Sequence, residues 1–94
     1  MKRHVLVIDD DEAVLQSCEA ILEDAGIEVA LAATPGTGLE MLKQERFDLA
    51  LIDLKLPGMN GMEVLQRACE ITPDLVPIIF TGFGTIETAV EAVK

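Results

Sequence analysis

The stretch DLALIDLKLPGMNGMEVL, residues 48–65, carries the clearest pattern of secondary structure in the chain. It opens on an apolar run, Leu49–Ile52, that ends at a single carboxylate, Asp53. A Pro-Gly pair and an Asn-Gly pair follow, and an amphipathic segment then begins at Gly61. A short, continuous apolar run is typical of a strand that is buried on both faces, as in a parallel sheet covered by helices. The stretch therefore predicts a buried strand, a glycine-rich loop and a helix, in that order.

The same alternation of apolar runs and amphipathic segments continues along the chain. Strands that alternate with helices of this length predict the α/β class, with a parallel sheet, right-handed crossovers and helices on both faces. Gly26 occupies the place of a left-handed helix cap, and Pro77 argues against a central position for its strand because proline donates no ladder bond. The expected strands are Val5–Ile8, Ile27–Leu31, Leu49–Ile52 and Leu75–Phe80, and the expected helices are Glu12–Ala25, Thr37–Gln44, Gly61–Glu70 and a last one from Thr85.

Composition narrows the functional classes. With 94 residues the chain predicts one domain, and 50% hydrophobic with only 3% aromatic residues predicts an aliphatic core. The net charge of −10 argues against direct nucleic-acid binding, because the phosphate backbone would repel the chain, but it suits a divalent cation. We expect a cytoplasmic protein without signal peptide or membrane span, and free buried thiols at Cys18 and Cys69. The last helix meets no stop signal, so we expect the domain, 1–94, to be cut there.

Four polar side chains follow three of the predicted strands. Asp9 and Asp10 follow the first strand, Asp53 the third and Thr81 the fourth. Ligands of open parallel α/β sheets bind beyond the carboxyl ends of the strands, so these groups converge if the first and third strands are neighbours. Carboxylates about 4 Å apart repel by roughly 4 kcal/mol at an effective dielectric constant near 20, so either one is protonated or a cation lies among them. Carboxylates and water suit Mg²⁺, and a phosphate that completes its shell favours phosphoryl transfer, with Asp53 as the candidate nucleophile.

Three motifs carry a family resemblance. VLVIDDDEAVL, LALIDLKLPGMNGMEVL and VPIIFTGFGTIETAVEAVK resemble the receiver domain of two-component response regulators, in order and across essentially the whole chain. The segments DLKLPGMNGMEVL and TGFGTIETAVEAVK are similar in sequence to receivers of σ54-dependent transcription activators of the nitrogen-regulatory type. The resemblance implies a flavodoxin-like, doubly wound parallel sheet of order 2-1-3-4-5. This chain would then hold the order 2-1-3-4, with the fifth strand and the fifth helix missing.

The resemblance also implies roles for particular residues. Asp53 would be phosphorylated by a sensor histidine kinase, and Asp9, Asp10, Asp53 and the backbone carbonyl of Lys55 would bind Mg²⁺. Thr81 would be the switch hydroxyl that moves toward the phosphoryl group and reshapes the face around the fourth helix. The chain would catalyse only its own phosphorylation and dephosphorylation, and it would switch an output domain, here a σ54-activator ATPase that regulates transcription.

The sequence departs from the family at its end. Receivers carry a lysine after the fifth strand that contacts the phosphoryl group. Lys94 lies in the last predicted helix and cannot be that lysine, so whether phosphorylation of Asp53 is coupled to Thr81 is an open question. A fourth strand at the edge predicts self-association, and the chain is a candidate homodimer through this edge or through the fourth-helix face.

Two other functions and several structural roles compete with this interpretation. A receiver-like interaction module that is not phosphorylated remains an alternative, whereas a haloacid dehalogenase-type phosphatase needs a second Asp where Lys55 stands. Asp11 and Glu12 are expected to favour the start of a helix through its dipole. Asn60 is expected at a turn and helix entry, and Met41, Met59 and Met62 as core or loop filler.

Overall fold

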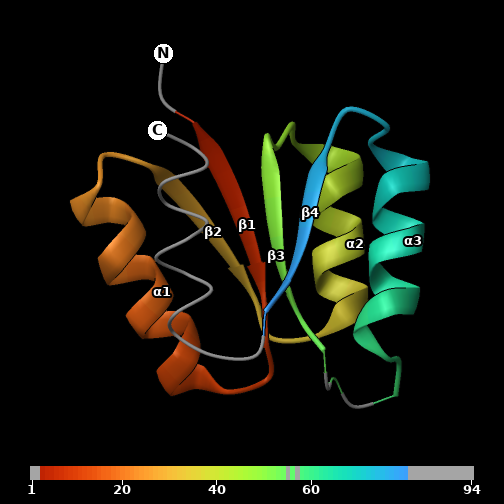
Figure 1. The fold of residues 1–94 in the computed structure, drawn as a ribbon, viewed down its shortest axis with the longest axis horizontal. Coiled ribbons are helices and arrows are strands. Elements are labelled where there is room, and N and C mark those ends of the chain that lie inside the picture. Colours follow the sequence, from red (N-terminus) through yellow and green to blue (C-terminus); the bar gives the residue numbers. More distant parts are fainter. Residues whose placement is uncertain (1–2, 55, 57, 81–94) are drawn as a thin grey trace.

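The computed structural model describes residues 3–54, 56 and 58–80. These residues form a parallel sheet of four strands in the order β2-β1-β3-β4, with α1 on one face and α2 and α3 on the other (Figure 1). The predicted fold and strand order are therefore confirmed. The predicted helix from Thr85 and the candidate site residues Lys55 and Thr81 lie outside the described residues. The elements are β1 His4–Ile8, α1 Glu12–Asp24, β2 Glu28–Ala32, α2 Pro35–Gln44, β3 Leu49–Asp53, α3 Gly61–Ile71 and β4 Val76–Phe80.

Both faces of the sheet are buried, which explains the continuous apolar runs in the sequence. Successive residues of a strand point to opposite faces. Val5 and Val7 of β1 accordingly pack in the core layer under α1, with Cys18 and Leu22 of that helix. Leu6 and Ile8 pack in the other layer, against α2 and α3, with residues such as Leu42, Ile52, Val64 and Ala68. β1 and β3 therefore lie at the centre of a two-sided aliphatic core.

The end of α1 accounts for the start of β2 one residue later than predicted. Gly26 has φ of +80°, a left-handed conformation that glycine adopts at little cost, and its N–H donates to the Glu23 carbonyl at 2.9 Å. The N–H of Ile27 donates to the Leu22 carbonyl at 3.0 Å. Ile27 thus completes the helix cap, and β2 begins at Glu28.

The second helix begins two residues earlier than predicted. Thr34 is its N-cap, and the Thr34 hydroxyl accepts a hydrogen bond from the N–H of Thr37 at 3.1 Å. Pro35 occupies the first helical position, where the N–H that proline lacks would have no partner in the helix. The Thr-Pro pair is therefore the true start signal.

The sequence predicts that Met62, Val64, Leu65 and Ala68 face inward on the third helix, and the inward face of α3 in the structure is narrower. Gly61, Val64 and Ala68 are buried, whereas Leu65 is half-buried and the side chain of Met62, expected inside, is 55% exposed. The buried residues recur at spacings of three and four, and Met62 lies about 100° away from that stripe because each helical residue turns by this angle. Met41 and Met59 do pack against the core, as expected. Within the part of the chain that the structure describes, no helix is long and apolar enough to cross a membrane.

Candidate functional site

Three carboxylates meet at the carboxyl end of the sheet. Oxygens of Asp9, Asp10 and Asp53 all lie within 4.8 Å of one another, and these residues are called the acidic cluster below. Asp9 and Asp10 follow β1, and Asp53 is the last residue of β3. β1 has β2 on one side and β3 on the other, so the cluster lies where the strand order reverses. This is the position at which open parallel sheets bind ligands.

The register of the sheet brings the acids together. Ile8 of β1 is opposite Ile52 of β3, so the next residue of each strand, Asp9 and Asp53, emerges at the same level. The N–H of Asp9 donates to the Ala32 carbonyl at 3.1 Å, which extends the ladder with β2 by one residue. Asp53 is held from the other side, opposite Phe80 of β4. The predicted convergence of Asp9, Asp10 and Asp53 is therefore present in the structure.

The three acids differ in how far their side chains are exposed to solvent. Asp9 is 4% exposed and is the buried polar residue among those that the structure describes, Asp53 is half-buried, and Asp10 is exposed. Burial raises the pKa of Asp9, and the nearby charges of Asp53, Asp10 and Asp11 act in the same direction. The N–H of Asp11 donates to a carboxylate oxygen of Asp9 at 2.9 Å and opposes this rise in pKa. Asp9 is thus the acid whose negative charge most needs a neighbouring cation.

Asp11 belongs to the helix and not to the acidic cluster. It is the N-cap of α1, and its carboxylate accepts a hydrogen bond from the N–H of Ala13 at 2.9 Å. Glu12 lies in the first turn of the same helix, where the helix dipole favours an acid. Both residues start the helix, as expected from the sequence.

The loop after β3 returns directly to the end of that strand. Gly58 has φ of +79°, and Asn60 is the N-cap of α3, so its expected role at a turn and helix entry is confirmed. The N–H of Gly61 donates to the Leu54 carbonyl at 3.0 Å. The start of α3 is therefore tied to the backbone beside Asp53. The sequence predicts a turn and helix entry for the Asn-Gly pair, and the structure adds the hydrogen bond that joins Gly61 to the strand end.

The donors of the acidic cluster fit Mg²⁺. Carboxylate oxygens are hard ligands of the kind that Mg²⁺ prefers, and two strands supply them within one small volume. The graded burial leaves the side of Asp10 open to solvent, where a further ligand can approach. A cation bound by these carboxylates would place positive charge beside Asp53. This charge would allow the Asp53 carboxylate to approach an anionic group.

The two cysteines differ in their surroundings. Cys18 on α1 is fully buried, and burial together with the charge of Asp9 raises the pKa of its thiol to about 11. Cys69 on α3 is half-buried, so the expectation of two buried thiols holds for Cys18 only. Both are free thiols, as expected.

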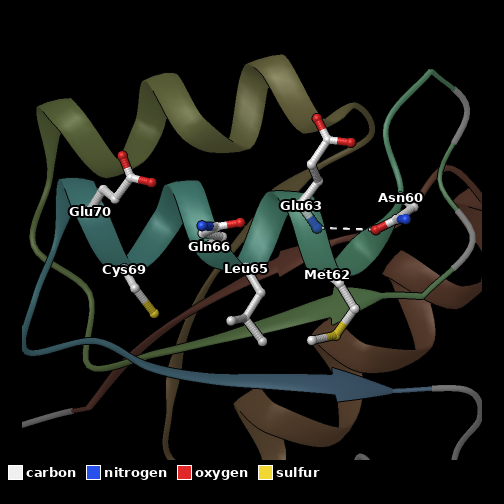
Figure 2. A pocket seen from close by; sticks show the side chains of 7 residues that line it. All are labelled: Asn60, Met62, Glu63, Leu65, Gln66, Cys69 and Glu70. Carbon is white, nitrogen blue, oxygen red and sulfur yellow. Dashed lines mark hydrogen bonds between the residues drawn. The ribbon is translucent and has the colours of Figure 1, made fainter.

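Among the described residues, a groove and a pocket lie away from the acidic cluster. A groove of about 710 Å³ runs along α3, and Figure 2 shows Met62, Leu65 and Cys69 on the side of the helix that faces β4. A pocket of about 430 Å³ lies near the amino end of β4, where Arg46 pairs with Asp74 at 3.6 Å. Neither is lined by a residue of the acidic cluster.

Comparisons with known proteins agree with the geometry. The family described as response regulator receiver domain matches residues 5–94. The transcriptional regulatory protein ZraR of Escherichia coli is 36% identical over 90 residues, which are 96% of this chain but 20% of ZraR. A receiver domain protein (CheY-like) from Methanospirillum hungatei has a TM-score of 0.82 and 38% identity, and the match covers 99% of this chain and 77% of that one.

A further solved structure that is similar to this chain contains a phosphorylated aspartic acid. It is a response regulator protein from Burkholderia pseudomallei, described with a phosphorylated aspartic acid, a calcium ion and citrate. Its TM-score is 0.80 at 32% identity, over 98% of this chain and 54% of that one.

Proposed function

Because the chain belongs to the response regulator receiver domain family, we propose that it is a phosphoacceptor whose Asp53 receives a phosphoryl group in a Mg²⁺-dependent reaction. The observation that carries the proposal is the convergence of Asp9, Asp10 and Asp53 within 4.8 Å at the switch point of the sheet. The phosphorylated aspartic acid of the Burkholderia pseudomallei relative supports the same chemistry.

Each acid has a different part in the proposed reaction. Asp53 lies at the end of β3 and is half-buried, so its carboxylate is held by the strand and is still open to an incoming phosphoryl group. Asp9 is the buried member of the acidic cluster and Asp10 is the exposed one, and together with Asp53 they would hold Mg²⁺. When bound, the ion neutralises the negative charge of the carboxylates and of the phosphoryl oxygens.

The transfer is a nucleophilic displacement at phosphorus. An oxygen of Asp53 forms the new P–O bond while the P–N bond of a phosphohistidine on the sensor kinase breaks. The imidazole leaves with the bonding electron pair and takes up a proton. The product is an acyl phosphate on Asp53, which water later hydrolyses.

Further parts of the proposal concern residues and partners outside the described structure. The backbone carbonyl of Lys55 is a further metal ligand, and Thr81 is the switch hydroxyl that responds to the phosphoryl group. The chain spans 20% of the length of ZraR, so an output domain that regulates transcription, such as a σ54-activator ATPase, is proposed as the recipient of the signal. Homodimerisation through β4 or the fourth-helix face is a proposed part of that response, and the cytoplasm is the proposed location.

Phosphorylation by a small donor tests the proposal. The 94-residue chain is incubated with MgCl₂ and acetyl phosphate, and intact mass spectrometry follows the addition of one phosphoryl group. Asp53→Asn keeps the shape of the side chain and removes the nucleophilic oxygen, so we expect no adduct. Asp74→Asn removes one carboxylate outside the acidic cluster and serves as the matched control. A wild-type chain that gains no phosphoryl group removable by hydroxylamine, the reagent that cleaves an acyl phosphate, would instead favour an interaction module that is not phosphorylated.

A further inference from the structure

Gly61 lies against the backbone of the strand end that carries Asp53. A Cβ built on Gly61 would lie 2.5 Å from the carbonyl oxygen of Asp53 and 2.8 Å from Cα of Leu54. Both distances are far below van der Waals contact, and real Cβ atoms essentially never show them. The first residue of α3 is therefore packed so closely on Asp53 that only a hydrogen atom fits between them.

Lack of space for a side chain, and not an unusual backbone conformation, explains why residue 61 is a glycine. Among the described glycines, the positive φ angles belong to Gly26 and Gly58, so the backbone of Gly61 is one that any residue adopts. Gly61 is the first residue of α3, and its Cα approaches backbone atoms, which cannot rotate away as a long side chain can. The close approach of the two backbones is therefore the reason why position 61 requires a glycine.

Neither side of the contact can withdraw easily. On the helix side, Asn60 accepts a hydrogen bond from the N–H of Glu63 at 3.0 Å (Figure 2), and Val64 is fully buried in the core. On the strand side, Asp53 is opposite Phe80 of β4. The hydrogen bond from Gly61 to the Leu54 carbonyl at 3.0 Å joins the two sides. The first residue of α3 therefore limits how closely the backbone of Asp53 can approach the helix.

We propose that Gly61 is a positioning residue for the phosphoacceptor. It touches neither metal nor phosphoryl group, but the fit of its Cα against Asp53 sets where the carboxylate lies relative to Asp9 and Asp10. A side chain at position 61 must push the end of β3 away from α3, and this moves the Asp53 oxygens out of the acidic cluster. The inference rests on the proposed phosphoacceptor function, and it adds the residue that places the reacting group.

The primary test compares two glycines in the first turns of helices. Gly61→Ala introduces the Cβ against Asp53, whereas Gly36→Ala introduces the same methyl group in the first turn of α2, where nothing lies within 4 Å. Mg²⁺ affinity is measured by calorimetry, and the rate of phosphorylation is measured against acetyl phosphate concentration at saturating Mg²⁺. Misplaced supporting residues reduce metal affinity by about 10- to 100-fold, and we expect Gly61→Ala to fall in this range and to lose kcat. Gly36→Ala should match the wild type in both measurements.

Gly38→Ala controls for loss of packing. Its Cβ would lie 2.5 Å from the Cδ1 atom of the Ile8 side chain, so it strains the core without touching the backbone of Asp53. We expect this variant to unfold at lower urea concentration than the wild type, with a kcat for phosphorylation closer to the wild type than that of Gly61→Ala. If both variants lost kcat in proportion to stability, Gly61 would have a structural role only, and the inference would be wrong.

A second pair of variants covers the case in which Gly61→Ala does not fold. Asn60→Ala removes the cap beside Asp53, and Thr34→Ala removes the equivalent cap of α2, which also accepts from an N–H three residues later. Weaker Mg²⁺ binding and slower phosphorylation in Asn60→Ala than in Thr34→Ala would support the inference, and equal values would overturn it.

The outcomes separate this inference from the proposed function. A wild-type chain that is phosphorylated, with Gly61→Ala equal to Gly36→Ala, overturns the positioning role and leaves the function intact. A wild-type chain that binds Mg²⁺ but takes no phosphoryl group refutes the function, and the Mg²⁺ affinities of the two variants then decide the positioning role. A wild-type chain that does neither refutes both.

Discussion

The substitution Asp9→Asn probes the electrostatic cost of the acidic cluster. Asn has nearly the same shape, and its side-chain oxygen can still accept the hydrogen bond from the N–H of Asp11. The carboxylate oxygens lie within 4.8 Å, for which Coulomb's law gives about 3.5 kcal/mol of repulsion per pair at an effective dielectric constant of about 20, and about 1 kcal/mol at that of water. Because Asp10 is exposed and screened, we expect Asp9→Asn to raise the free energy of unfolding by about 1–2 kcal/mol at neutral pH without divalent cations.

The pH dependence fixes the sign of this effect. The pKa of Asp9 is raised in the folded state, so the folded chain holds this proton more tightly than the unfolded chain. Stability contributed by Asp9 is therefore present at low pH and is lost as the pH rises from the usual carboxyl range through the raised pKa. The wild type and Asp9→Asn should thus converge in stability at acidic pH and diverge toward neutral pH.

Urea unfolding followed by far-ultraviolet circular dichroism measures these differences, because the chain has neither Trp nor Tyr to report by fluorescence. In EDTA at pH 7 a gain of 1 kcal/mol corresponds to about 4–8 °C in Tm for a domain of this size. Mg²⁺ at 100 times its Kd should stabilise the wild type by about 2.7 kcal/mol and Asp9→Asn by much less. Glu28→Gln, an exposed residue that starts β2, controls for the change in net charge. An Asp9→Asn chain that is less stable than the wild type in EDTA, or equally stabilised by Mg²⁺, would refute the reasoning.

Three further predictions follow from the structure. In calorimetric titrations the Mg²⁺ affinity should fall as the pH is lowered from neutral into the carboxyl range, because the pKa of Asp9 is raised and this carboxylate takes up a proton before an ordinary one does; an affinity that does not fall would contradict the assignment of ligands. At pH 8 a thiol reagent should modify Cys69 in the folded chain and Cys18 only on unfolding, because the Cys18 thiol is fully buried with a pKa of about 11; equal rates would show that α1 opens readily. Gly26→Ala should lower the free energy of unfolding by about 1 kcal/mol in urea titrations, because alanine is strained at φ of +80°, whereas Gly36→Ala should not; equal midpoints would argue against the left-handed cap.

Much of the fold was predictable because local patterns in this chain agree with its tertiary structure. The run of four apolar residues before Asp9 and the run before Asp53 predicted buried parallel strands, and both strands are buried on two faces. The errors lie at element ends and on one helix face. Ile27 was assigned to a strand because it is apolar, but its N–H completes the cap of α1. Met62 was counted with the inward-facing apolar residues of the third helix, although its angular position on α3 places it outside.

The convergence of the three acids was predictable from the sequence, but the differences in burial among them were not. Strand ends, order and the switch point sufficed to expect Asp9, Asp10 and Asp53 together, and the structure brings their oxygens within 4.8 Å. The sequence predicted different roles for Asp53 and the other two acids but no difference in their burial, whereas the structure buries Asp9 and exposes Asp10. This difference depends on the neighbours that each side chain meets after the strand ends, which no local pattern encodes.

Residue types and short spacings were enough to specify the alternation of strands and helices, the apolar runs that must be buried, and the acids at the ends of those runs. These features are local, because they depend on residue type and on spacings of two to four residues. Only the tertiary structure decided which carboxylate loses its water and how closely α3 returns to the end of β3. Both depend on distances between segments that are separate in the chain, where a difference of one ångström decides whether a Cβ fits beside Asp53.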